Sequence, residues 1–320
     1  MDEDPFGSYG LRTVCLTDKP LFDVCFATCP ARLSDYTFPN VFIWRDSIHL
    51  YWRLIHDCLC VFANGDGTLT MLLPPIGDGD VRRALDECLG ICDAYNADRR
   101  RPHATRVEYV SEDLLGRLGG DLHVSPMSGD YIYETRRMID LAGGDLASKR
   151  QARNRFLRRY DVRTEAFEAR HMPHCLALLA LWQAQALPDS QIPSAVQIKR
   201  AKEIAATADA MRHYRQLNLH GMVLYAGQEV AGFTLGEQLT ADTCSILIEK
   251  TNREFTGSAQ FIFSEFCRQY WSAYRWCNVG DDWDVPSLAW TKESYRPAAR
   301  LPKFTVRPRR AAAALIPAPA

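Results

Sequence analysis

The sequence predicts an α+β protein built from two halves with a similar order of elements. In each half a hairpin or meander of strands precedes a further strand and a helix, and tight-turn signals at 64–67 and 227–228 mark the hairpins. The chain has 320 residues, 47% of them hydrophobic, which is enough for two domains of ordinary size. We therefore expect one domain over 1–135, a second over 136–308 and a disordered tail over 309–320.

Helices in the first half are predicted where apolar side chains recur at helical spacing, and strands where β-branched and aromatic residues are bounded by turns. The expected helices are 18–28, 80–95 and a short one beginning at Ser111, and the expected strands are 57–63, 68–73, 106–110 and 131–133.

The same criteria predict more helix in the second half, where a Gly143-Gly144 break precedes the first helical stretch. The expected helices are 141–160, 172–186, 196–217 and 257–274, and the expected strands are 222–226, 229–235, 243–250 and 276–279.

Charge and hydropathy exclude several protein classes. Lysine and arginine number 38 against 39 aspartates and glutamates, so only a local basic patch would serve a nucleic acid. The sequence contains no run of about 18 apolar residues, so we expect no membrane-spanning helix. The acidic start, MDEDPFGSYG, does not resemble a secretory signal, so we expect a cytoplasmic protein.

The eleven cysteines do not predict a disulfide framework or a metal site. Their number is odd, and the zinc spacing C-x-x-C does not occur. The pairs Cys25/Cys29 and Cys88/Cys92 would each share a helix face, but they lie among apolar residues. We interpret them as small buried hydrophobic residues.

The first segment that could bind a ligand is 149–160, in which six of twelve residues are lysine or arginine and none is acidic. In helical projection Lys149 and Arg153 share the apolar face with Phe156. Cations on a buried face need partners or an anionic ligand. Lys149, Arg150 and Arg155 are therefore candidate phosphate contacts, and a solvated helix face is the alternative.

The second segment, 250–259, joins a strand to a helix and ends in small residues. Thr256, Gly257 and Ser258 would stand at the start of that helix, where free backbone N–H groups and the helix dipole favour an anion such as a pyrophosphate. A tight turn with a threonine or serine cap explains the same residues without a ligand.

The third segment, 277–288, places Asp281, Asp282 and Asp284 directly after a predicted strand. Such a loop suits a general base, a site for a substrate ammonium group or a metal. A loop of aspartates that only caps the next helix is the alternative.

Together these segments resemble the phosphatidylglycerol lysyltransferase C-terminal-domain family. The resemblance covers about residues 18–305 in the right order. The matching motifs are Asp130-Tyr131-Ile132-Tyr133, Lys149-Arg150 with Asn154-Arg155-Phe156, Asn278…Asp282…Pro286…Leu288…Lys292…Ser294-Tyr295-Arg296-Pro297, Phe38-Pro39-Asn40-Val41-Phe42-Ile43-Trp44 and Leu73-Pro74-Pro75.

The resemblance implies two tandem GNAT-like domains, in which mixed sheets are flanked by helices. It also implies an acyltransferase that moves an aminoacyl group from aminoacyl-tRNA to a lipid or small-molecule acceptor, with a phospholipid head group as a further partner and without a cofactor or metal. Asp282 would then be the base or hold a substrate ammonium group, and Tyr295 would protonate the leaving atom. The implied substrate and phosphate contacts are Lys149, Arg150, Arg155, Asn278, Lys292, Thr256, Gly257 and Ser258.

This chain departs from the family at several positions, and two other functions stay open. Gln151 and Arg153 replace the usual asparagine and isoleucine, and the segment 278–284 lacks the usual arginine and glutamate. Glu254 stands where the acetyl-CoA loop of a GNAT enzyme has glutamine or arginine. The alternatives are an N-acyltransferase that uses acyl-CoA as donor, and a non-catalytic member that binds a small molecule.

Overall fold

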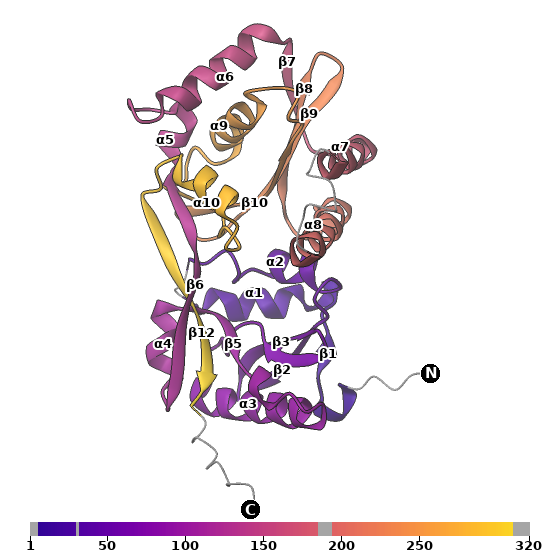
Figure 1. The fold of residues 1–320 in the computed structure, drawn as a ribbon, viewed down its shortest axis with the longest axis vertical. Coiled ribbons are helices and arrows are strands. Elements are labelled where there is room, and N and C mark those ends of the chain that lie inside the picture. Colours follow the sequence, from indigo (N-terminus) through magenta and orange to yellow (C-terminus); the bar gives the residue numbers. More distant parts are fainter. Residues whose placement is uncertain (1–5, 30–31, 185–193, 310–320) are drawn as a thin grey trace, which may run out of the picture.

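One continuous sheet of twelve strands runs the length of the molecule, with helices on its faces (Figure 1). The computed structural model describes residues 6–29, 32–184 and 194–309. The strand order is β1-β2-β3-β4-β5-β12-β6-β11-β10-β9-β8-β7, with both parallel and antiparallel neighbours. This arrangement confirms the predicted α+β class with a mixed sheet.

The first half begins with a two-residue strand and ends in a long one. Its elements are β1 (Arg12–Thr13), α1 (Lys19–Ala27), α2 (Phe38–Trp44), β2 (Leu50–Ile55), β3 (Cys58–Gly65), β4 (Thr68–Met71), α3 (Val81–Asp98), β5 (Val107–Ser111), α4 (Glu112–Leu118) and β6 (Leu122–Glu134).

Two helices, α5 (Thr135–Asp140) and α6 (Ala147–Arg159), connect this half to the second. The elements that follow are β7 (Val162–Ala166), α7 (Met172–Ala184), α8 (Ser194–His213), β8 (His220–Ala226), β9 (Glu229–Gln238), β10 (Thr243–Thr251), α9 (Ser258–Tyr270), β11 (Trp276–Asn278), α10 (Pro286–Glu293) and β12 (Ala299–Pro308).

The two halves repeat one order of elements. In each, a strand and two helices precede three antiparallel strands, and a helix then leads to a parallel strand. The parallel pairs are β4 with β5 and β10 with β11. The fold is therefore two tandem GNAT-like units, as expected.

The halves exchange their last strands. β6 of the first half pairs with β11 of the second, and β12 of the second half pairs with β5 of the first. β6 and β12 also pair with each other over most of their length. Neither unit completes its part of the sheet alone. The boundary at 135/136 stays a prediction, and it does not divide the molecule into two separate sheets.

An irregularity between Leu301 and Lys303 interrupts the pairing of β12 with β6. Pro302 has no N–H group to donate at this point. On β6, Gly129 lies so close to Leu301 that an added Cβ would overlap its carbonyl oxygen. The bulge turns the side chain of Lys303 into the interior, where it is 1% exposed.

Lys303 binds three carboxylates. Its Nζ lies 2.5 Å from an oxygen of Asp35, 2.6 Å from Asp130 and 2.9 Å from Asp281. Burial alone would raise the pKa of Asp130, but Lys303 and the N–H groups of Ser34 and Asn278 hold it below its usual value. The pKa of Asp35 is raised by burial. The cluster thus ties β6, β12 and loops from both halves into one charged core.

The sequence prediction is right for most of the elements that it named. It did not name β1, α2, β2, β7 or α10, and it differs from the structure at three further places. The strand β12 was not predicted, because two prolines and alternating charged residues obscure its pattern. The expected helix over 141–160 begins later, at Ala147, because Leu141 adopts a left-handed conformation and ends the separate, unpredicted helix α5. The predicted strand over 131–133 is the end of the 13-residue β6.

All eleven cysteines are free, and eight of them are buried. Among the described residues no helix combines the length and hydropathy that crossing a membrane requires. The predicted tail over 309–320 lies outside the described residues except for Arg309, which forms an ion pair with Asp121.

Replacing Gly129 by alanine should destabilise the protein by about 2 kcal/mol, because the new methyl group must push β12 away from β6. Gly116→Ala is the matched control: this helical glycine is surrounded by open space, and alanine there should stabilise by about 0.5–1 kcal/mol. Urea unfolding measures both. Equal midpoints for the two variants would contradict the close approach of the strands.

Replacing Lys303 by methionine should cost about 3–5 kcal/mol at pH 8, because three buried carboxylates lose their counter-charge. Without Lys303 the pKa values of Asp35 and Asp130 rise in the folded state, which then binds protons more tightly than the unfolded chain. The deficit should therefore shrink as the pH falls from 8 to 5. Arg307→Met on the same strand is the control, and a deficit independent of pH would indicate lost packing instead.

Candidate functional site

The loop after β11 is held from three directions. Lys292 of α10 donates to the carbonyl oxygens of Val279, at 2.6 Å, and of Gly280 and Asp281. Burial lowers the pKa of Lys292 to about 8. The amide of Asn278 donates to Asp130, at 2.8 Å, and to the carbonyl oxygen of Arg32. Lys292 and Asn278, expected to contact substrate, bind the protein's own backbone and charged core.

Two consecutive residues of this loop are strained. Trp283 and Asp284 have φ values of 52° and 57°, in the left-handed region that bulky side chains rarely adopt. Trp283 is held by an edge contact with the ring of Trp44 at 5.6 Å, and Lys199 of α8 donates to its carbonyl oxygen at 3.3 Å. Backbone strain maintained by surrounding contacts is typical of functional sites.

Asp282 accepts hydrogen bonds from several donors. Ser128 Oγ and Tyr131 OH each lie 2.6 Å from its carboxylate oxygens, and the N–H of Asp284 lies at 3.0 Å. Arg300 forms a longer ion pair at 3.5 Å. Burial raises its pKa, but these bonds outweigh burial and hold the pKa below its usual value. Asp282 is therefore a weak proton acceptor near neutral pH.

A groove of about 480 Å³ opens beside Asp282. Its polar side chains include Ser128, Asp284 and Arg300, and Met127 and Pro286 contribute apolar surface. This volume falls in the range of small-molecule sites. The carboxylates of Asp282 and Asp284 outnumber the single guanidinium, so the groove favours a cationic group.

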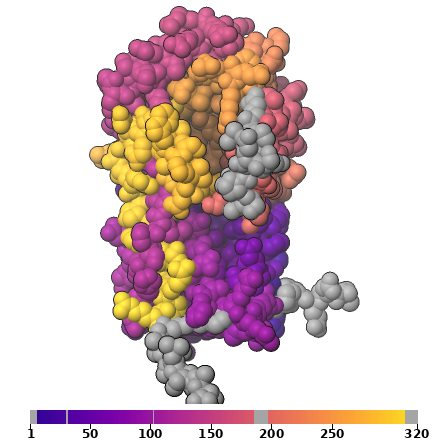
Figure 2. Space-filling view, in the orientation of Figure 1, coloured from indigo at the N-terminus to yellow at the C-terminus, as the bar shows by residue number. Residues whose placement is uncertain are grey.

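A second concavity lies where the parallel strands separate. β10 pairs with β11 only from Thr243 to Ser245, and among the described strands β10 continues from Ile246 to Thr251 beside β9 alone. Figure 2 shows the molecule hollowed between the yellow segment that contains α10 and the orange strands of the second half.

Glu249 of β10 lies at this separation. Its Oε2 is shielded from solvent and has no hydrogen-bond partner among the described residues. Burial raises its pKa to about 8. Its charge acts on Tyr295 and on Cys267 of α9, which places the carboxyl on the α9 side of the sheet. This is the only described glutamate whose buried oxygen lacks a partner.

Tyr295 and Lys149 lie on the same side of the sheet as Glu249. Tyr295 is buried, and burial together with the Glu249 charge raises its pKa. The Lys149 ammonium lies 4.4 Å from the centre of the Tyr295 ring, a cation–π contact. Burial lowers the pKa of Lys149. Tyr295 thus lies between a base candidate, whose charge acts on it, and a cation that contacts its ring.

The predicted anion site at the start of α9 is covered by α6. Gly257 and Ser258 are both buried, and a Cβ on Gly257 would overlap the carbonyl oxygen of Ala152. The Ser258 N–H donates to the carbonyl oxygen of Phe255 at 3.0 Å. This hydrogen bond closes a tight turn and occupies an N–H group that an anion would need. Thr256 remains exposed beside them.

The basic residues of α6 differ in their surroundings. Arg150 donates to the carbonyl oxygens of Leu141 and Gly143, so it caps the end of α5. Arg153 donates to Ile139 O at 3.1 Å. Arg155 is exposed. Of the three predicted phosphate contacts, Lys149 and Arg155 keep their cationic groups available and Arg150 does not.

The two predicted catalytic residues are not brought together. The described contacts include none between Asp282 and Tyr295, which are linked through two tyrosines on one face of β6. Tyr131 donates to Asp282, and the Tyr133 ring lies 6.1 Å from the Tyr295 ring. Both roles stay predictions, and the structure separates a cation-binding groove from the strand separation.

Four residues that build these places were missed by the sequence reasoning. Ser128 and Arg300 flank Asp282, and Lys303 and Glu249 are buried charges. A lysine on an unrecognised strand gives no signal of burial. Glu249 could have been noticed as the single acidic residue of its predicted strand, directly after the apolar run Ile246–Ile248.

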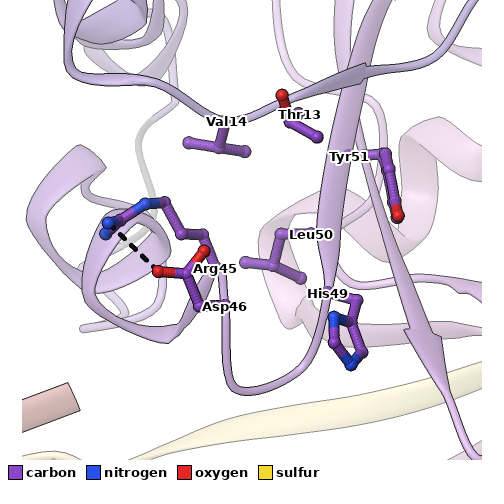
Figure 3. Close-up of a pocket in the computed structure, with 7 residues that line it drawn as sticks. All are labelled: Thr13, Val14, Arg45, Asp46, His49, Leu50 and Tyr51. Carbon is purple, nitrogen blue, oxygen red and sulfur yellow. Dashed lines mark ion pairs between the residues drawn. The ribbon is translucent and has the colours of Figure 1, made fainter. Parts of the chain in front are cut away.

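A smaller pocket of about 80 Å³ in the first half is too small for a substrate (Figure 3). Its cation, Arg45, pairs with Asp46 at 3.2 Å and with Asp209 of α8. The ion pair of Arg45 with Asp209 therefore links the two halves, and the guanidinium of Arg45 is not available to a ligand.

Comparison with known proteins agrees with this architecture. The sequence pattern of the family described as Phosphatidylglycerol lysyltransferase, C-terminal, matches residues 26–307. An uncharacterized protein of Mycoplasmoides gallisepticum is 26% identical over 180 residues, 56% of this chain and 56% of that protein. The match thus spans about half the length of that relative.

Three solved structures share the fold. A conserved protein of unknown function from Bacteroides thetaiotaomicron has a TM-score of 0.79 at 23% identity, over 92% of this chain and 98% of that one. The C-terminal domain of a putative lysylphosphatidylglycerol synthetase from Agrobacterium fabrum has a TM-score of 0.58 at 13% identity, over 91% and 92%. L-PGS from Bacillus licheniformis has a TM-score of 0.57 at 14% identity, over 80% and 82%.

The family pattern covers most of the chain, including the charged core and the loop after β11. The chain therefore belongs to the phosphatidylglycerol lysyltransferase C-terminal family, and it shares its fold with the C-terminal domain of a putative lysylphosphatidylglycerol synthetase and with L-PGS.

Proposed function

We propose that the protein transfers an aminoacyl group from aminoacyl-tRNA to a lipid or small-molecule acceptor. The observation that carries this proposal is the position of α6. This helix packs on Gly257, where a GNAT enzyme binds the pyrophosphate of coenzyme A, and presents exposed cations on its outer side. A donor whose phosphates lie outside the fold fits this arrangement, and coenzyme A bound at the start of α9 does not.

The transfer chemistry can be assigned to residues at the strand separation. An amine or hydroxyl of the acceptor attacks the ester carbonyl of the aminoacyl group. The proton of the attacking group passes to Glu249, whose raised pKa makes it a stronger base than an ordinary carboxylate. The bond from the carbonyl carbon to the 3′ oxygen of the RNA then breaks. Tyr295, kept protonated by its raised pKa, gives that oxygen a proton.

The groove beside Asp282 is proposed to hold a substrate ammonium group. The carboxylate of Asp282 stays ionised because its pKa is low, which suits cation binding better than proton transfer. Asp284 also belongs to the strained loop after β11, whose earlier residues Lys292 holds through their carbonyl oxygens. A substrate ammonium bound in the groove would therefore contact this loop directly. In this proposal Asp282 binds substrate and Glu249 is the base.

A transfer assay in a translation-competent extract tests the reaction. Purified protein is added with labelled amino acids, and label is followed into lipid and small-molecule fractions with and without RNase. Protein-dependent labelling that RNase abolishes is the expected result, and the labelled fraction identifies the acceptor class. Labelling that requires added acyl-CoA and resists RNase would overturn the proposal, as would no labelling with any amino acid.

Glu249→Gln should lower the transfer rate by roughly 100-fold or more, because the amide cannot accept the proton. With Glu249 present, kcat/KM should rise with pH and level off above about pH 8, where the carboxyl is ionised. The variant should lose this rise. Glu254→Gln, an exposed carboxyl in the loop before α9, is the matched control and should keep both rate and profile.

Tyr295→Phe should also lower the rate, because the leaving oxygen loses its proton donor. Tyr274→Phe, on the same side of the sheet, is its control. A Tyr295→Phe variant that folds normally and keeps the full rate would remove Tyr295 from the mechanism. It would leave the assignment of Glu249 to be decided by its own variant.

A further inference from the structure

Trp290 of α10 is the most exposed large hydrophobic side chain among the described residues, with 72% of its surface accessible. It belongs to the segment that borders the hollow in Figure 2. An indole presents a large flat apolar face on which another ring can stack. Trp290 therefore has an aromatic face available to a ligand.

Lys149 lies against this tryptophan. Its ammonium is 5.8 Å from the centre of the Trp290 ring and 4.4 Å from that of Tyr295. No carboxylate pairs with it in the described part of the chain, and burial is the one cause that shifts its pKa. A half-buried ammonium without a counter-charge favours an anion such as a phosphate.

An aromatic face and an anion site at this separation match the two parts of a nucleotide. We propose that Trp290 and Lys149 form a platform for an unpaired nucleotide, whose base stacks on the indole and whose phosphate binds the ammonium. The inference rests on the proposed function, in which the donor is an RNA. It assigns the single-stranded 3′ end of that RNA to the mouth of the hollow.

The surface of α6 extends this platform with positive charge. Arg155, Arg158 and Arg159 are exposed, and the segment 149–160 contains no acidic residue. The phosphates that follow the unpaired end would lie along this helix. Binding there would be sensitive to salt, because each neutralised phosphate releases counterions.

A lipid surface is the other class of partner that combines tryptophan with lysine, and the distribution of apolar residues disfavours it. Membrane surfaces take up helices that present several apolar side chains on one face. Besides Trp290, the exposed large hydrophobic residues are Val24, Leu54, Val124, Leu157, Leu181 and Ile198, which lie on six other elements. One isolated ring suits a stacked base better than a bilayer.

The test compares two RNA hairpins, one with an unpaired 3′ extension and one with a blunt end, bound to the full chain. Fluorescence anisotropy gives the two dissociation constants. The wild type should prefer the extended hairpin. Trp290→Ala should weaken that complex by about tenfold and leave the blunt one unchanged, and Trp290→Phe should restore most of the loss. Lys149→Gln should lower the salt dependence by about one counterion.

Val24→Ala removes an exposed apolar side chain from α1, outside the proposed platform and α6, and is the matched control. Equal weakening of both hairpins by Trp290→Ala, or no weakening, would overturn the platform. Binding to vesicles of anionic phospholipid that depends on Trp290, without preference for the extended hairpin, would overturn it in favour of a membrane contact. The transfer assay decides the proposed function separately, since transfer that Trp290→Ala leaves at full rate would refute only the platform.

Discussion

One buried ammonium group, that of Lys303, holds the two halves of the molecule together. It contacts carboxylates from a loop of the first half, from β6 and from the loop after β11. Each carboxylate would be costly to bury alone, and the lysine would be costly without them. The bulge formed by Pro302 and Gly129 exists at the point where this side chain must turn inward. The pairing of β6 with β12, the position of the loop after β11 and the neutralisation of the three carboxylates therefore all depend on the placement of Lys303.

The exchange of the last strands gives this constraint its functional consequence. Because β6 completes the sheet of the second half, Tyr131 and Tyr133 of the first half stand beside Asp282 and Tyr295. Ser34 adds a backbone donor to Asp130 from the same direction. The first half thus forms one wall of the site in the second half. Cutting the chain at 135/136 would remove β6 from β12, and with it the Asp130 partner of Lys303.

Sequence reasoning reaches the parts of this molecule that local patterns determine. The helix 81–98 and the hairpin of β3 and β4 follow from periodicity and turn residues. Glu249 and Lys303 could not be placed in this way, because their burial depends on how far β10 separates from β11 and on a strand, β12, whose partners are far away in the sequence. Gly257 was read correctly as a residue at a helix start, but only the packing of α6 shows that no anion has access there.

A comparison of free energies explains why α6 stays packed on the start of α9. An anion at a helix start contributes about 0.3–1 kcal/mol when exposed and about 2 kcal/mol in favourable, partly buried geometry. Phe156, which α6 buries completely against α9, contributes about 1.5–3 kcal/mol, and Tyr160 packs beside it. Displacing α6 to admit a pyrophosphate would therefore lose more free energy of packing than the anion would gain at the start of α9. In this chain the negative charge of a donor must be met elsewhere, and α6 itself presents exposed cations on its outer face.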